Sequence, residues 1–199
     1  MTASELLEEL KVIYKHKPNR LKHVLGVRDT AVQLGELHNA ECKKLETAAL
    51  LHDITKYYPK EKNIELITTH FPNSEEIIKE FNEHILHAFS AYIVAKEVYN
   101  ITDKDILNSI MNHTIGKADM NIYEKIIFIS DYIEPNRTYD SCIKVRNMAF
   151  ENIDLAVYTA INDSIIFYEN NGGQVPNSAY KARQFYLNLL GGKVWKKSK

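Results

Sequence analysis

The sequence contains few of the residues that interrupt regular structure. Seven glycines and five prolines in 199 residues leave long segments that a helix can occupy without a break. Only two cysteines occur, Cys42 and Cys142. They lie far apart, match no cysteine-based metal spacing and are expected to be reduced thiols in a cytosolic protein. A cysteine-based metal site is therefore not expected.

An excess of one charge and long apolar runs are lacking as well. The 25 basic and 26 acidic side chains leave a formal net charge of −1, which gives no general electrostatic reason to expect nucleic acid. The basic run 193–199 is short and is expected to be a solvated tail. No apolar run approaches the ~20 residues of a membrane-spanning helix, and the N-terminus has no signal-peptide pattern. We therefore expect a soluble, cytoplasmic protein with no membrane or nucleic-acid partner.

Apolar residues recur at helical spacing through almost the whole chain, without the period-two alternation of strands. The first helix has a capping-box pattern at Thr2 and Glu5 and an apolar face that includes Ile13. Shorter helices are predicted to start at Pro59 and, with a serine cap, at Ser74. Longer helices are predicted over about 19–38, 43–52, 84–99, 103–113, 122–134, 142–150, 152–170 and 178–190.

Cap and breaker residues bound several of these helices. Thr102 with Asp105 is interpreted as the cap of the helix that begins near 103, and Pro135 ends the most apolar helix, 122–134. No repeat, low-complexity segment or linker is visible. The sequence therefore predicts one all-α, multi-helix domain over residues 1–199.

An adjacent histidine and aspartate, His52 and Asp53, close the apolar helix 43–52, and Lys56 follows three residues later. Imidazole and carboxylate together form a donor set that suits a divalent transition metal. Neighbouring residues on a helix point about 100° apart. The pair can therefore meet one metal only at a bend or helix end, or each residue reaches toward a different ion.

Four further candidate ligands lie on other predicted helices: His23, His87, His113 and Asp131. A single histidine on an apolar face is more often a satisfied core residue, and a helical aspartate can face water. A buried carboxylate, however, needs a metal, a cation or hydrogen-bond donors. Together, the ordered set supplies enough ligands for two adjacent metals with open positions. His84, near His87, remains a candidate ligand, supporting donor or surface residue.

This ordered set resembles the HD-domain metal-dependent phosphohydrolases. Their defining ligands, a histidine, a His-Asp pair and a distant aspartate, are matched by His23, His52, Asp53 and Asp131. The two intervening histidines, His87 and His113, mark the subset that holds two metals.

The chain is most similar to one branch of that family, the bacterial symmetrical diadenosine-tetraphosphate hydrolases. The resemblance runs from about residue 18 to about 170, and its most specific part is Asp131-Tyr-Ile-Glu-Pro-Asn-Arg137. Ser90 stands where the family usually has glycine, and Ser130 where it usually has alanine. Both serines are small, so these departures concern packing more than chemistry.

The resemblance implies an all-α HD domain with two divalent ions, iron in the first place, with manganese or another ion able to substitute. Asp53 would bridge the ions, with His23, His52 and Asp131 on one and His87 and His113 on the other. A metal-activated hydroxide would attack a central phosphoanhydride of diadenosine tetraphosphate and release two ADP.

The same resemblance assigns roles to neighbouring residues. Lys56, together with His52 and Asp53, would belong to the catalytic group. Positive charge from Lys56, Arg20 and Arg137 would stabilise the transferring phosphoryl group, whereas Thr114 and Gly116 would line the phosphate path through a hydroxyl and a backbone N–H. Surface ion pairs are the simpler interpretation of the three cations. Three interpretations of Glu134 stay open: an acidic residue at a helix end, a residue that supports a metal ligand, or a contact to the ribose.

Other functions fit the same residues. One is an HD nucleotidase that acts on deoxynucleoside mono- or triphosphates; another is a nucleotide-binding module whose metal site no longer turns over. The plainest is an all-α scaffold with buried histidines and no metal. The preferred nucleobase and the metal stay open, and the apolar segments are compatible with a homodimer.

Overall fold

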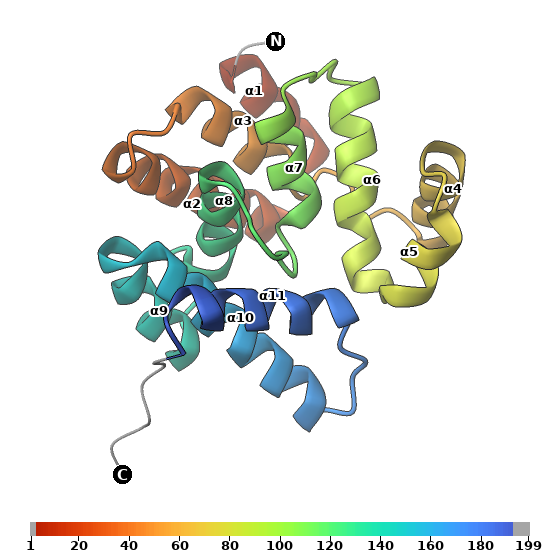
Figure 1. The fold of residues 1–199 in the computed structure, drawn as a ribbon. Helices are drawn as coiled ribbons and strands as arrows, with labels where there is room; N and C mark the ends of the chain where they lie inside the picture. The colour runs from red at the N-terminus through yellow and green to blue at the C-terminus, as the bar shows by residue number, and fades with distance from the viewer. Residues whose placement is uncertain (1–2, 193–199) are drawn as a thin grey trace.

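The computed structural model describes residues 3–192, and all regular structure in that range is helical (Figure 1). Thr2 and the basic run 193–199 lie outside the described residues. The helices of the described range are α1 Ala3–Ile13, α2 Pro18–Leu37, α3 Cys42–Leu51, α4 Lys60–His70, α5 Ser74–Glu80, α6 Glu83–Glu97, α7 Lys104–Asn112, α8 Ile122–Ile133, α9 Asp140–Glu151, α10 Ile153–Asn170 and α11 Asn177–Leu189. The all-α prediction is confirmed.

Local capping chemistry explains where two of the helices begin. At α8 the Asn121 side chain accepts from the Glu124 N–H, and the Glu124 carboxylate accepts from the Asn121 N–H, a reciprocal capping box. At α7 the cap is Asp103, whose carboxylate accepts from the N–H groups of Asp105 and Ile106. The prediction of Thr102 as this cap is wrong, because a carboxylate one residue later reaches both free N–H groups.

Two other local expectations also need correction. Asn73, not Ser74, stands in the cap position of α5, and no side chain caps that helix. Ile13, expected on the apolar face of the first helix, is 45% exposed, whereas Leu6 and Leu10 are buried. Ile13 is the last residue of α1, where the chain turns toward α2 and leaves this side chain uncovered.

Helix α8 lies at the centre of the main hydrophobic core. Its residues Ile126, Ile127, Phe128 and Ile129 are buried in one cluster with side chains of α2, α3, α7 and α10. Burying one such side chain contributes about 1.5–3 kcal/mol, so this run holds the helix firmly. Asp131 follows it two residues later and is thereby carried on a fixed support.

Helices α4 and α5 form a side layer that packs against α6 around Ile67, Ile77 and Leu86 (Figure 1, right). At the bottom of Figure 1, α10 packs against α8, α9 and α11, and the Ser178 N–H at the start of α11 donates to Glu80 Oε1 at the end of α5. The ends of α3 and α7 and the first turns of α6 thus lie between these two layers. Among the described helices, none is long and apolar enough to cross a membrane.

Candidate metal centre

The His52-Asp53 pair lies at a bend, one of the arrangements expected for it. Helix α3 ends at Leu51, and the segment 52–57 continues as consecutive turns, with the Lys56 N–H donating to the Asp53 carbonyl. Two contacts fix this bend. The Tyr14 hydroxyl donates to the Asp53 carbonyl at 2.9 Å, and the Thr55 hydroxyl donates to the His87 carbonyl at 2.7 Å.

The Asp53 carboxylate lies between two pairs of histidines. Its Oδ2 atom is 3.7 Å from His23 Nε2 and 3.3 Å from His52 Nε2. Its Oδ1 atom is 3.0 Å from His87 Nε2 and 3.7 Å from His113 Nε2. The structure therefore brings all four predicted histidines to one carboxylate, and each oxygen faces a different pair.

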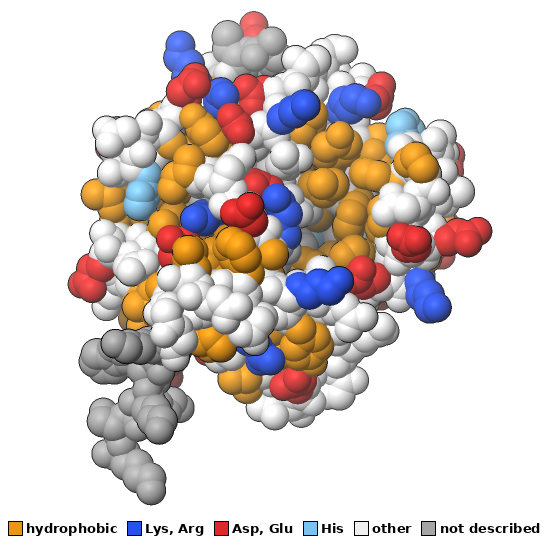
Figure 2. Space-filling model, viewed as in Figure 1, with side chains coloured by type: hydrophobic (Ala, Val, Ile, Leu, Met, Phe, Trp, Pro, Cys, Tyr) orange, Lys and Arg blue, Asp and Glu red, His pale blue; other side chains and the backbone are white. Residues whose placement is uncertain are grey.

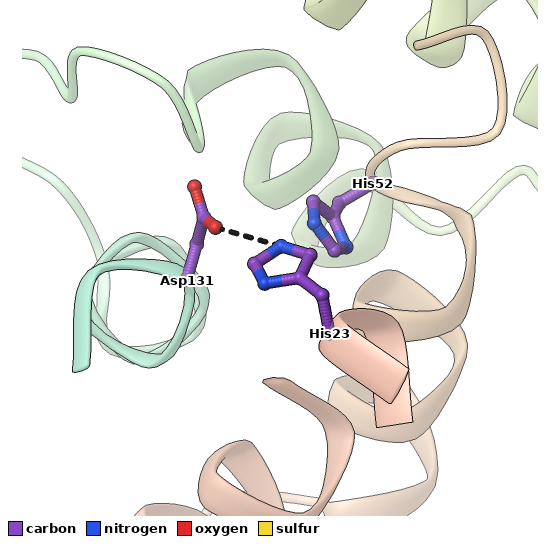
Figure 3. Close-up of side chains that lie close together, drawn as sticks. All are labelled: His23, His52 and Asp131. Atoms are coloured by element: carbon purple, nitrogen blue, oxygen red, sulfur yellow. Dashed lines mark ion pairs between the residues drawn. The ribbon is translucent and has the colours of Figure 1, made fainter. Parts of the chain in front are cut away.

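A first group of donors combines His23, His52 and Asp131 (Figure 3). They come from α2, the end of α3 and α8, and one ligand atom of each lies within 4.8 Å of the others. His23 Nε2 is 3.1 Å from Asp131 Oδ1. A second group at the same spacing combines His52, Asp53 and His113, and His87 Nε2 lies 3.1 Å from His113 Nε2 beside it.

Hydrogen bonds at Nδ1 orient three of these imidazoles. His52, His87 and His113 each place Nδ1 2.6–2.7 Å from the carbonyl oxygen three residues earlier. A carbonyl can only accept, so Nδ1 carries a proton and Nε2 faces the centre, where it offers a lone pair when the ring is neutral. For His87 that carbonyl belongs to His84, whose side chain is exposed. His84 thus supports a neighbouring histidine through its backbone.

The donor set fits a divalent cation. The Nε2 atoms of His23 and His52 are buried, and their contacts with the carboxylates of Asp131 and Asp53, at 3.1 and 3.3 Å, lack hydrogen-bond geometry. Buried nitrogen lone pairs of this kind are costly without a partner, and a metal ion would satisfy both. Imidazole nitrogen and carboxylate oxygen are ligands that zinc, iron and manganese accept.

The electrostatics hold the carboxylates in their ligand form. Burial alone would raise the pKa of Asp53, but the charge of His52 and hydrogen bonds from the surrounding histidines outweigh it and leave this pKa well below its usual value. At Asp131, burial alone would likewise raise the pKa, but the charge of Arg137 and the contact with His23 outweigh burial and keep this pKa well below its usual value. Burial lowers the pKa of His113 to about 4. Metal ligands must be deprotonated, and the low pKa values of Asp53, Asp131 and His113 meet that need. At His52 burial opposes but the Asp53 carboxylate raises the pKa, so a bound metal would have to displace a proton there.

The three predicted cations all reach this centre. Arg20 Nη1 donates to Asp53 Oδ2 at 2.5 Å, and Arg137 Nη2 donates to Asp131 Oδ1 at 2.8 Å. Lys56 Nζ lies 3.4 Å from His87 Nε2. None of them is a remote surface ion pair, since each contacts a predicted ligand.

Of the two residues predicted to line the phosphate path, Thr114 lies in the wall of the cavity, whereas Gly116 forms a turn next to it. Thr114 lines the cavity beside the centre, and its buried hydroxyl has no partner among the described residues. Gly116 is buried with φ +67°, and its N–H donates to the Asn112 carbonyl. That N–H is thus used within its own turn, and a phosphate contact at Gly116 stays a prediction. Gly116 forms the left-handed turn after His113, where a Cβ would meet Met120 at 3.2 Å.

Sequence reasoning missed two supporting residues. Arg146 on α9 donates to the carbonyls of Ile133, Glu134 and Arg137 at 2.7–2.9 Å and so holds the loop after α8. Tyr14 fixes the Asp53 backbone, as described above. Neither could be found from spacing, because a buried tyrosine and a helical arginine are common residues.

A cavity of about 810 Å³ opens from the centre. Its polar end carries Lys56, Thr114 and Arg137, and its other wall is formed by α10 and the segment leading into α11. That wall is largely apolar and includes Ile161, Ile165, Tyr168, Val175 and Pro176. Figure 2 shows this face of the molecule hollowed near its middle, with charged and apolar side chains around the hollow. The volume is ample for a nucleotide-sized ligand.

Comparison with known proteins gives a consistent result. Residues 20–136 match the model of the HD domain. The chain is 38% identical to a symmetrical bis(5'-nucleosyl)-tetraphosphatase from Halalkalibacterium halodurans and 35% identical to one from Bacillus subtilis, each over 75% of this chain and 79% of the relative.

The fold also matches a solved structure. A predicted HD superfamily hydrolase involved in NAD metabolism from Clostridium acetobutylicum superposes with a TM-score of 0.88 at 35% identity. The match covers 95% of this chain and 98% of the other. The two serines at positions where a smaller residue was expected, Ser90 and Ser130, are fully buried on α6 and α8, the helices that carry His87 and Asp131.

Proposed function

The chain belongs to the HD-domain family, and we propose that it is a metal-dependent hydrolase that cleaves diadenosine tetraphosphate symmetrically to two ADP. The observation that carries this is the Asp53 carboxylate held between two pairs of histidines, beside a nucleotide-sized cavity that His113 and Asp131 line. The names of the relatives from H. halodurans and B. subtilis support the choice of substrate. We further propose that residues 1–199 act as one domain.

The proposed ligands divide between two ions, iron or another divalent metal. His23, His52 and Asp131 would hold one, His87 and His113 would hold the other, and Asp53, whose carboxylate faces both pairs of histidines, would serve both. When bound, such ions lower the pKa of water and polarise phosphoryl oxygens. The hydrolysis adds one water across the central anhydride and yields two nucleoside diphosphates, so no other reactant is needed.

The surrounding cations bind and orient the polyphosphate. Arg20 donates a hydrogen bond to Asp53, and Arg137 donates one to Asp131. Lys56 lies beside His87. An arginine side chain can donate two parallel hydrogen bonds to a phosphate. The Lys56 ammonium instead acts as a point charge where the cavity meets His87. Thr114 offers a free hydroxyl along the same wall of the cavity.

Product analysis tests this function directly. Protein loaded with iron or manganese is incubated with diadenosine tetraphosphate, and the nucleotides are separated by chromatography. We expect ADP as the main product and little turnover of deoxynucleoside mono- or triphosphates. ATP and AMP as products would contradict symmetrical cleavage, and faster turnover of a nucleoside mono- or triphosphate would assign the chain to the nucleotidases.

A further inference from the structure

A second, smaller recess lies beside the same centre, with His87 in its lining and no lining residue from α10 or α11. Its volume is about 220 Å³, and it lies between the start of α4 and the first turns of α6. Lys56 and His84 line both this recess and the large cavity. The two spaces therefore adjoin at Lys56 and His84, next to the proposed metal centre, and lead to different elements of the fold.

A buried and unsatisfied acceptor marks the small recess. Asn63 is 4% exposed, and its Oδ1 atom has no hydrogen-bond partner among the described residues. Its Nδ2 atom makes one long hydrogen bond, 3.4 Å, to the Tyr58 carbonyl. A buried amide oxygen without a donor is costly, and because Asn63 lines the recess, a molecule that enters it can supply the missing donor.

The other walls offer groups suited to a nucleoside. The Tyr58 side chain is 39% exposed and presents an aromatic ring, and the His84 ring is exposed beside it. At the rim, Lys60 Nζ and Glu83 Oε2 are 3.9 Å apart, and both side chains are about half exposed. Lys56 marks the inner end, 3.4 Å from His87. The recess is thus polar with aromatic surfaces, while the far wall of the large cavity is apolar.

The proposed reaction requires two such spaces. In phosphoryl transfer the attacking oxygen, the phosphorus and the leaving oxygen lie roughly in line. The two halves of a tetraphosphate cut at its centre must then leave the reaction centre in different directions. The large cavity takes one half, and the small recess is the other described space that shares Lys56 and His84 with it.

We propose that the recess between α4 and α6 binds the second nucleoside of the dinucleotide, with Asn63 Oδ1 accepting a hydrogen bond from it and Tyr58 contacting its base. This inference rests on the proposed function. It follows that the two identical halves of the substrate are recognised by unlike surfaces, and that a substrate with one nucleoside loses the contacts at Asn63 and Tyr58 while keeping those in the large cavity.

The test compares two substrates, diadenosine tetraphosphate and adenosine 5'-tetraphosphate, which has a single nucleoside. In Asn63→Leu, which keeps the volume and removes the acceptor, we expect the ratio of kcat/KM for the dinucleotide to that for the mononucleoside compound to fall by about tenfold. The partly exposed Tyr58→Ala should lower the same ratio without endangering the fold. Asn147→Ala, an exposed asparagine on α9, is the matched control and should leave the ratio unchanged.

The outcomes separate this inference from the function on which it rests. If the unaltered protein releases no ADP from the dinucleotide, the proposed function fails before any variant is made. If it does, and Asn63→Leu and Tyr58→Ala leave the ratio unchanged, the second nucleoside does not occupy the recess. An equal loss for both substrates, with less bound metal, would also overturn the inference and make Asn63 a support of the His87 region.

Discussion

Glu134 accepts a hydrogen bond from His23: its Oε1 atom lies 3.2 Å from His23 Nδ1, and both side chains are buried. His23 therefore differs from His52, His87 and His113, whose Nδ1 atoms rest on neutral carbonyls of their own helices. A carboxylate is the stronger acceptor and makes the imidazole a better electron donor at Nε2. Glu134 thus positions the one ligand histidine that comes from α2.

The other oxygen of Glu134 is equally well held. The backbone N–H and the side-chain amide of Asn136 each donate to Oε2 at 2.7 Å. On the α2 side, Gly26 leaves the space for this carboxylate, because a Cβ at that position would lie 2.5 Å from Oε2. The run from Asp131 to Arg137 therefore carries a proposed ligand, a support for the proposed ligand His23, and a cation.

We expect Glu134→Ala to lower metal affinity by roughly 10–100-fold, the usual effect of losing an outer partner of a ligand histidine. Glu134→Gln keeps an acceptor for His23 Nδ1 and should recover much of the affinity. Competition with a chelator, followed by elemental analysis, measures both variants. Equal affinity in Glu134→Ala and in the unaltered protein would show that His23 needs no such support.

A methyl group placed at Gly26 should also lower metal affinity, although it leaves both Glu134 and His23 unchanged in sequence. In Gly26→Ala the new Cβ displaces the Glu134 carboxylate, so metal affinity should fall together with stability. Gly35→Ala on the same helix is the control, because its Cβ would collide with the Leu45 side chain instead. That variant should lose stability but keep its metal affinity, and a parallel loss of both quantities in the two variants would contradict the link to Glu134.

Much of the fold could be predicted from the sequence because the helices are strongly periodic. The apolar run 126–129 indicated a central helix, and α8 is central in the structure. The ordered histidines and aspartates also indicated the residues that meet, since each lies at a helix end or on an apolar face. The convergence of His23, His52, His87, His113 and Asp131 around Asp53 matches that expectation.

The rest depends on contacts between elements that are distant in sequence. Nothing near Glu134 in the sequence shows that its carboxylate meets His23, 111 residues away. In the same way, the use of the Gly116 N–H within its own turn and the contribution of the His84 carbonyl follow only from backbone geometry. Sequence patterns identify ligand types, whereas these supports are set by how the helices pack.

The number of bound metal ions should depend on which histidine is removed. We expect His113→Ala to reduce the metal content from about two ions per chain toward one, because it leaves His23, His52 and Asp131 intact. Asp53→Ala should reduce it further, since the carboxylate faces both pairs. His84→Ala is the matched control and should retain the metal, because its backbone carbonyl remains. Elemental analysis gives the counts, and an unchanged count in Asp53→Ala would reject the bridging role.

Arg137→Ala should reduce kcat/KM for diadenosine tetraphosphate by roughly 10²–10³-fold, the scale expected for a charge that stabilises the transferring group. Arg137→Lys should restore little, because an ammonium cannot reproduce the two-bonded fork. Metal content should stay near normal, which separates substrate binding from a role in holding Asp131. If metal content and activity fall together, Arg137 acts through its 2.8 Å contact with Asp131 instead.

Tyr186 offers a test of the packing behind the site. Its buried hydroxyl accepts from the Met120 N–H at 3.2 Å and thereby ties α11 to the segment before α8. Tyr186→Phe leaves that N–H without a partner at a cost of about 1–3 kcal/mol, and Tm should fall by roughly 2–4 °C per kcal/mol. Tyr180→Phe on the same helix removes only an exposed hydrogen bond to Glu169 and should change Tm little. Thermal unfolding measures both variants, and equal Tm values would mean that water replaces the lost hydroxyl at Met120.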